Sequence, residues 1–181
     1  MKRLQHLYKK SFCLSEETDK EFFDCVRDYY YTQEFQSLDK SIQHGSITLI
    51  QHIKSVAYLS YRISKKLNLD FCKTARGALL HDLFYYDWHD PDPSHRLHGY
   101  FHPGFALKNA RELSAKNNLE LSEIEENIIY RHMFPLTVIP PKYKESLLVC
   151  LVDKYVATKE IIICSSEKRS KKFFGEIKES K

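Results

Sequence analysis

The segment from Ile47 to Leu67 places apolar side chains at steps of three and four residues, the spacing of one face of an α-helix. These positions are Leu49, Ile53, Val56, Leu59, Ile63 and Leu67. A half-buried strand would alternate every second residue, so the spacing predicts an amphipathic helix over about 47–67. The chain is 43% hydrophobic and 29% charged and has only five glycines, which also favours helices over an architecture with many turns.

Five further segments show helical spacing. They are predicted over about 16–35, 71–84, from Pro103 onward, 122–133 and 143–163. Ser122 and Glu125 have the spacing of a capping box, which marks a helix start. The intervening segment Asp87–Gly99 contains Pro91 and Pro93 and is expected to be a loop. Together these segments predict an all-α protein, a single-domain helical bundle.

The net charge is distributed unevenly along the chain. Of the net charge of +4, the segment 165–181 contributes +3, because it holds six Lys or Arg residues and three Glu residues. The rest of the chain is therefore close to neutral, which argues against the basic stripe of a nucleic-acid-binding protein. We expect residues 1–40 to form an N-terminal helical segment packed on the core, 41–164 the main domain, and 165–181 a solvated basic C-terminal tail.

Several other classes of protein are disfavoured. No apolar run approaches the length needed to cross a bilayer or to form a signal segment, so no membrane association is expected. The five cysteines are scattered and show no Cys-x-x-Cys spacing, which argues against a disulfide framework and against a cysteine zinc site. A reducing cytoplasm is the expected compartment.

Five of six ionisable residues fall on or beside the apolar stripes of the predicted helices, and the sixth, His102, lies at the start of the fourth helix. The six are His52, His81, Asp82, His102, His132 and Asp153. Any one of them alone is more often a hydrogen-bonded core residue than a metal ligand. All six in one small core would leave several polar groups without partners, at about 1–3 kcal/mol each, unless a cation lies between them. Imidazole and carboxylate ligands suit iron, manganese, cobalt or zinc, so one or two such divalent ions are expected.

The order His, His-Asp, His, His, Asp resembles the HD-domain superfamily of metal-dependent hydrolases, over about residues 42–160. The resemblance implies a helical bundle, residues 41–164, around a metal held by His52, His81, Asp82 and Asp153. It also implies a second metal held by His102 and His132, with Asp82 as a bridge. His102 opens the sequence His-Pro-Gly-Phe-Ala, which is similar to a helix start of that family.

A two-metal centre would activate a water molecule and hold a phosphoryl group, so phosphoester hydrolysis is the expected reaction. Asp82 and His81 are the expected catalytic residues, and a small phosphorylated metabolite or nucleotide is the expected substrate. Four cations near the ligands are candidates for substrate binding, namely Arg76, Lys73, Arg131 and Lys154. The alternative for each of them is an ordinary surface charge or a salt bridge.

The sequence leaves alternatives open. The cyclic-dinucleotide phosphodiesterases of this superfamily read His-Asp-Ile-Gly-Lys, whereas this chain reads His81-Asp82-Leu83-Phe84-Tyr85, so that substrate class is disfavoured. A di-iron oxygenase, similar to the inositol oxygenases, has the same ligand order and is the second candidate. The third is a non-catalytic sensor module that keeps the metal pocket. The oligomeric state is not indicated by the sequence.

Overall fold

The computed structural model describes residues 2–40, 42–44, 47–85 and 98–179; the side chains of 39–46, 98–99 and 167–179 are not described. Within these residues the protein is helical, with eight α-helices and one short two-stranded ribbon. This confirms the predicted all-α class. The ribbon pairs β1 (Ile42–His44) with β2 (Ile47–Thr48) in antiparallel register.

The elements before the ribbon are short and cover one end of the bundle. They are α1 (Lys2–Lys10), a 3₁₀ turn (Ser11–Cys13), α2 (Lys20–Tyr30), α3 (Gln33–Gln36) and a second 3₁₀ turn (Ser37–Lys40). The sequence predicted one helix over about 16–35, but the structure breaks it after Tyr30. Thr32 caps α3 by accepting a hydrogen bond from the backbone N–H of Phe35, which starts a separate helix.

The central helix is α4 (Leu49–Lys66), which the apolar periodicity predicted. Thr48 caps its start by accepting a hydrogen bond from the backbone N–H of Gln51. The helix ends before Asn68, whose φ of 54° lies in the left-handed region that Asn tolerates. Ile53, Val56 and Leu59 on its apolar face are fully buried.

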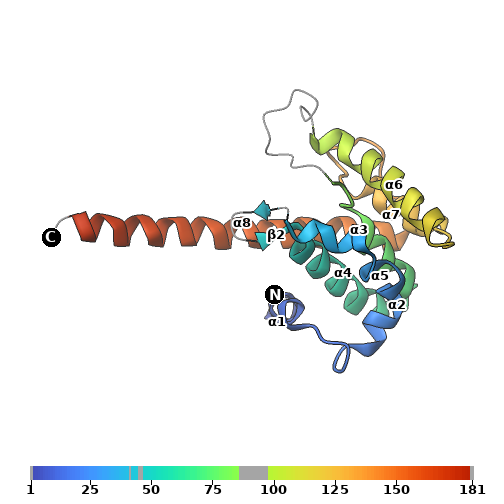
Figure 1. The fold of residues 1–181 in the computed structure, drawn as a ribbon, viewed down its shortest axis with the longest axis horizontal. Helices are drawn as coiled ribbons and strands as arrows, with labels where there is room; N and C mark the ends of the chain where they lie inside the picture. The colour runs from blue at the N-terminus through green and yellow to red at the C-terminus, as the bar shows by residue number, and fades with distance from the viewer. Residues whose placement is uncertain (1, 41, 45–46, 86–97, 180–181) are drawn as a thin grey trace.

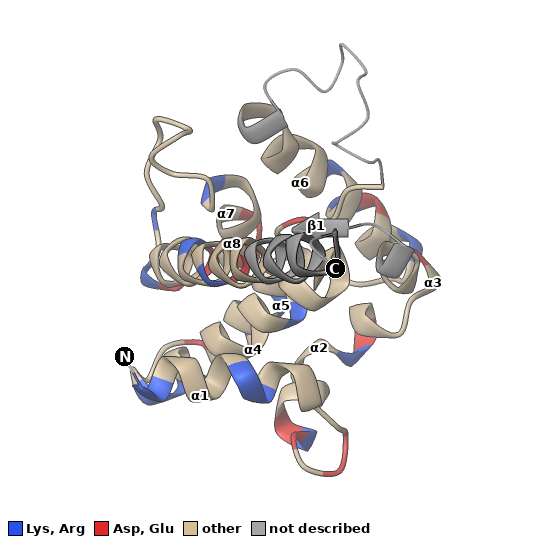
Figure 2. Ribbon diagram, turned by 90° about the vertical axis from the view of Figure 1, so that its left-hand side faces the viewer, with Lys and Arg blue, Asp and Glu red and all other residues tan. Residues whose placement is uncertain are grey.

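The remaining helices pack around α4. They are α5 (Phe71–Leu80), α6 (His98–Lys116), α7 (Glu123–Arg131) and α8 (Lys144–Glu179). In Figures 1 and 2, α8 passes between α6 and α7 on one side and α4 and α5 on the other. Helix α8 contacts α4, α5 and α7, so it joins the two halves of the bundle.

Three predicted boundaries differ from the structure. Helix α5 ends at Leu80, before His81 and Asp82, and α6 begins at His98, so Pro103 lies inside it. Helix α8 continues past residue 163 to Glu179, so the predicted tail 165–181 is helical as far as the structure describes it. The capping box of Ser122 and Glu125 at the start of α7 is confirmed. Residues 86–97, which include most of the predicted loop, lie outside the described residues.

A disulfide joins Cys25 of α2 to Cys72 of α5. The scattered spacing of the cysteines had argued against disulfides, and that expectation was wrong for this pair. The two residues are separated by 47 positions and meet only because α2 packs against α5. Sequence spacing carries no signal for such a contact.

The described residues show neither a membrane span nor a segregated charge pattern. None of the described helices combines the length and apolar character needed to cross a bilayer. Figure 2 shows Lys and Arg positions interspersed with Asp and Glu positions over several helices. Several of these charges form surface ion pairs, for example Arg111 with Glu126 and Lys108 with Glu112.

Candidate metal centre

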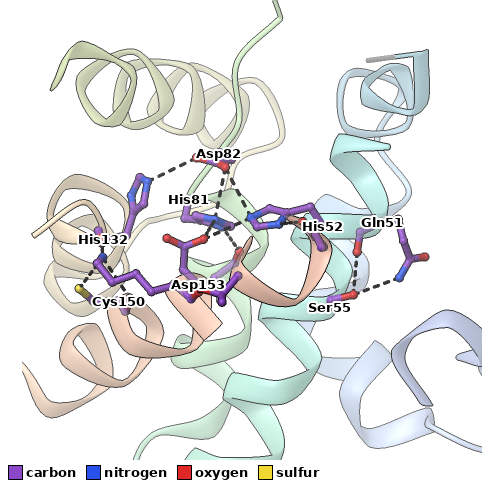
Figure 3. A network of polar contacts seen from close by, with 12 residues as sticks. Gln51, His52, Ser55, His81, Asp82, His132, Cys150 and Asp153 are labelled. Carbon is purple, nitrogen blue, oxygen red and sulfur yellow. Dashed lines mark hydrogen bonds and ion pairs between the residues drawn. The ribbon is translucent and has the colours of Figure 1, made fainter. Parts of the chain in front are cut away.

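Side chains from five parts of the chain meet inside the bundle. His52 comes from α4, His81 and Asp82 directly follow α5, His102 lies in α6, His132 follows α7, and Asp153 lies in α8. All six are buried, with exposed fractions between 0% and 8%. Figure 3 shows His52, His81, Asp82, His132 and Asp153 directed toward a common centre. The structure therefore brings together all six residues that the sequence singled out.

The end of α5 places the His-Asp pair. Asp70 caps the start of this helix by accepting a hydrogen bond from the backbone N–H of Lys73. The helix stops at Leu80, and the backbone turns through His81 and Asp82 instead of continuing to Phe84 as the sequence predicted. Asn109 of α6 holds this turn, because its side-chain amide donates to the carbonyl of Leu83 at 2.8 Å.

Asp82 directs its two carboxylate oxygens to different histidines. Oδ2 lies 3.8 Å from Nε2 of His52 and 3.5 Å from Nε2 of His81. Oδ1 lies 3.2 Å from Nε2 of His102 and 3.4 Å from Nε2 of His132. The carboxylate of Asp82 therefore lies between two groups of ring nitrogens, a first group from His52 and His81 and a second group from His102 and His132.

Asp153 completes the first of these groups. Its Oδ1 lies 3.2 Å from Nε2 of His52 and 3.7 Å from Nε2 of His81. The second group consists of His102 and His132, whose Nε2 atoms lie 2.8 Å apart. The first group therefore contains a carboxylate of its own, whereas the second shares that of Asp82.

The neighbouring histidines keep the carboxylates of Asp82 and Asp153 ionised. Burial alone would raise the pKa of Asp82, but the electrostatic influence of His81 and the neighbouring rings of His102 and His132 outweigh it and hold that pKa well below its ordinary value. Burial would also raise the pKa of Asp153, but the neighbouring rings of His52 and His81 lower it further than burial raises it. Two negative charges are therefore present among the rings at neutral pH.

The pKa values of the rings follow the positions of the acids. Burial lowers the pKa of His52, but Asp153 and Glu160 together raise it well above its ordinary value. At His132 burial dominates, and its pKa is lowered despite the nearby carboxylate of Asp82. His132 is therefore neutral at pH 7 and has a lone pair to offer a cation.

The donor atoms fit a divalent cation. His52, His81 and Asp153 each offer one ligand atom, and these atoms lie within 4.8 Å of one another; the same is true of His81, Asp82 and His132. Nε2 of His81 is buried and makes no hydrogen bond to any described residue. A buried nitrogen without a hydrogen bond costs free energy that coordination of a metal would recover. Nitrogen and carboxylate ligands without thiolate suit Fe, Mn, Co or Zn.

The four candidate substrate cations lie in different surroundings. Nε of Arg76 forms an ion pair with the buried Glu125 at 2.6 Å, and Nζ of Lys73 pairs with Asp70 at 3.1 Å. Nζ of Lys154 donates to the backbone carbonyl of His132 at 2.9 Å.

Arg131 stacks over the ring of Tyr130 and forms no ion pair with a described residue. It lines a cavity of about 210 Å³ together with Pro103 and Val138. Pro103 follows His102 and Arg131 precedes His132 in the chain, so this cavity is lined by chain neighbours of two residues of the buried cluster.

One buried residue that contacts this cluster, Glu160, was not singled out from the sequence. Oε2 of Glu160 lies 2.8 Å from Nδ1 of His52, and Glu160 is completely buried. The two residues are 108 positions apart. Glu160 is seven residues after Asp153, so it lies on the same face of α8; this spacing was the available signal.

The comparisons with known proteins gave one match. The family model for the HD domain matches residues 49–158, which is more than half of the chain. No match was found among curated proteins or among solved structures. The matched range contains all six residues of the buried cluster, in the order that the resemblance implied. This chain therefore belongs to the HD domain family, whose fold is all-α and whose members are commonly metal-dependent hydrolases.

Proposed function

We propose that this protein is a metal-dependent phosphohydrolase that cleaves a phosphoester of a small metabolite or nucleotide. The observation that supports the proposal most is the position of Asp82, whose two oxygens face two separate groups of histidine nitrogens. In this proposal the metal ligands are the six residues of the buried cluster: His52, His81, Asp82, His102, His132 and Asp153. Asp82 would contribute one oxygen to each of the two groups of ligands.

The metals would supply Lewis-acid activation of a water molecule and of a phosphoryl oxygen. The chain itself supplies the rest of the site. The buried carboxylates of Asp82 and Asp153 are ionised at neutral pH and hold the cations, and the surrounding apolar helices keep bulk water away from them. His81 and Asp82 have the catalytic role in this proposal, because both adjoin both groups of ligands.

Substrate phosphate requires a cation near the metals. Among the four candidates we propose Arg131, because it precedes His132 in the chain, lines a cavity together with Pro103, and forms no ion pair with a described residue. Its guanidinium would bind a phosphate through two parallel hydrogen bonds. Lys154 would act indirectly by holding the backbone of His132. Arg76 and Lys73 already have acidic partners and are weaker candidates.

The test is an assay of the purified protein with Mn²⁺ against a panel of phosphomonoesters and phosphodiesters. We expect phosphate release that is lost in His81→Ala and in Asp82→Ala, with helical content retained. His6→Ala is the matched control, because His6 is exposed on α1 and should leave activity unchanged.

The same preparation separates the alternatives. Oxygen uptake with ferrous iron and no phosphate release would contradict the proposal in favour of a di-iron oxygenase. Binding of Mn²⁺ without either activity would favour a non-catalytic sensor. A cytoplasmic location and the absence of a nucleic-acid partner remain predictions from the sequence.

A further inference from the structure

The histidines of the buried cluster orient their rings in two ways. His81 and His132 each follow the last residue of a helix, and their Nδ1 atoms lie 2.7 Å from the carbonyl of Ala78 and 2.8 Å from that of Ile129. These carbonyls are in the last turn, where a helix leaves backbone oxygens without intrahelical partners. A carbonyl only accepts, so each Nδ1 carries the hydrogen and each Nε2 is left with a lone pair facing the cluster.

His52 cannot use the same arrangement. It lies inside α4, where the backbone carbonyls that precede it accept the hydrogen bonds of the helix itself. Its Nδ1 instead lies 2.8 Å from Oε2 of Glu160, which α8 brings to the far side of the ring. Figure 3 shows the ring of His52 with its other edge toward Asp82 and Asp153.

Glu160 forms few other polar contacts with the described residues. It is 0% exposed, and it forms no ion pair with a Lys or Arg among the described residues. Its other oxygen, Oε1, makes no hydrogen bond to a described residue. A buried carboxylate with a single hydrogen-bond partner is costly. The position of Glu160 beside His52 therefore indicates a function at that ring.

We propose that Glu160 is a positioning residue of the metal centre, which acts through His52. The inference rests on the proposed metal binding and not on phosphate hydrolysis. The carboxylate accepts the Nδ1 hydrogen of His52, which leaves the Nε2 lone pair toward Asp153 and Asp82. Its negative charge behind the ring strengthens the donation of electrons from Nε2 to a cation, which the carbonyl partners of His81 and His132 do less.

The experiment compares Mn²⁺ binding by Glu160→Gln and by the wild-type chain with titration calorimetry. Gln has nearly the same volume but lacks the charge and can also donate to Nδ1, so it no longer enforces one tautomer. We expect the Kd for Mn²⁺ to rise about 10- to 100-fold. The matched control is Glu125→Gln, because Glu125 is also completely buried but pairs with Arg76. This control should lower the Tm and change the Kd by less than about twofold.

A second measurement does not require the variant to fold. In the ¹⁵N-labelled wild-type protein loaded with Zn²⁺, the ring spectrum of His52 should show a protonated Nδ1 and a metal-bound Nε2. An unchanged Kd in a folded Glu160→Gln variant, or a protonated Nε2 of His52 in the Zn²⁺-loaded wild type, would overturn the inference. Absence of Mn²⁺ binding by the wild type would overturn both this inference and the proposed function, whereas binding without phosphate release would overturn the proposed function alone.

Discussion

Nε2 of His102 lies 2.8 Å from Nε2 of His132, and both nitrogens lie within 3.4 Å of Oδ1 of Asp82. Nδ1 of His132 donates to the carbonyl of Ile129, so in the neutral ring its Nε2 has a lone pair and no hydrogen. The short contact therefore requires a hydrogen on Nε2 of His102. A divalent cation between the rings would replace that hydrogen and use both lone pairs.

The two groups of ligands should therefore load separately. We expect His102→Ala and His132→Ala each to lower the Mn²⁺ content from about two ions per chain to about one, because His52, His81 and Asp153 remain. Metal content after equilibration with Mn²⁺ and desalting measures this. His6→Ala should keep both ions. A variant that still binds two ions, or that binds none while folded, would contradict the division of the site.

Gly77 lies where α5 passes α7, so a side chain there should disturb both helices that lead into the site. A Cβ at this position would lie 2.8 Å from Cδ1 of Ile128 and 3.2 Å from the backbone of Glu125. We expect Gly77→Ala to destabilise the fold by about 1–2 kcal/mol, because overpacking exceeds the gain in helix propensity. Urea unfolding measures the effect.

Gly104 is the matched control for this prediction. It also lies within a helix, but a Cβ there would meet only Cε2 of Tyr130, at 4.0 Å. Gly104→Ala should therefore stabilise the protein by up to about 1 kcal/mol. Equal effects of the two substitutions would show that the approach of α5 to α7 is not close in solution.

The disulfide between Cys25 and Cys72 should stabilise the bundle by closing a long loop in the unfolded chain. For a sequence separation of 47 residues, the chain-entropy model gives about 4 kcal/mol, and measured values are often 2–4 kcal/mol. We expect a phosphine reductant to lower the free energy of unfolding by about that amount. The Cys25→Ser variant should be less stable from the outset and insensitive to the reductant. If the reductant has an equal effect on both proteins, the disulfide is not the cause.

The ion pair of Arg111 with Glu126 should make stability depend on pH. Hydrogen bonds from Arg111 lower the pKa of Glu126 in the folded state, so the pair stabilises the fold above the unfolded pKa of Glu126. That contribution is lost as the pH falls through the lowered, folded pKa. Both side chains are partly exposed, so we expect Arg111→Gln to cost only about 0.2–1 kcal/mol at pH 7.

The measurement is chemical unfolding of both proteins across the acid range. The difference between wild type and Arg111→Gln should shrink as the pH falls through the lowered, folded pKa of Glu126. Lys108→Gln is a control, because Lys108 pairs with Glu112 at the longer distance of 3.9 Å. A difference for Arg111→Gln that persists at low pH would mean that packing of the side chain, and not its charge, is responsible.

Periodicity located the helices well and their ends poorly. The stripe of Leu49, Ile53 and Val56 predicted α4 to within two residues, because a buried helical face requires that spacing wherever the helix packs. The end of α5 before His81 was missed, because apolar and buried residues continue through Phe84 although the backbone turns. The continuation of α8 to Glu179 was also missed, since a charged segment without an apolar stripe carries no helical periodicity.

The residues of the buried cluster could be named from the chain alone, because six ionisable groups on apolar faces are costly without a shared partner. Their role as metal ligands stays a prediction. Which atoms face one another was decided by packing: the two sides of Asp82, the ring of His52 against Glu160, and the pairing of Arg76 with Glu125 all join distant segments. The local sequence indicates which face of a helix must be buried. A contact between residues 108 positions apart depends on how the helices cross, and only the folded structure contains that information.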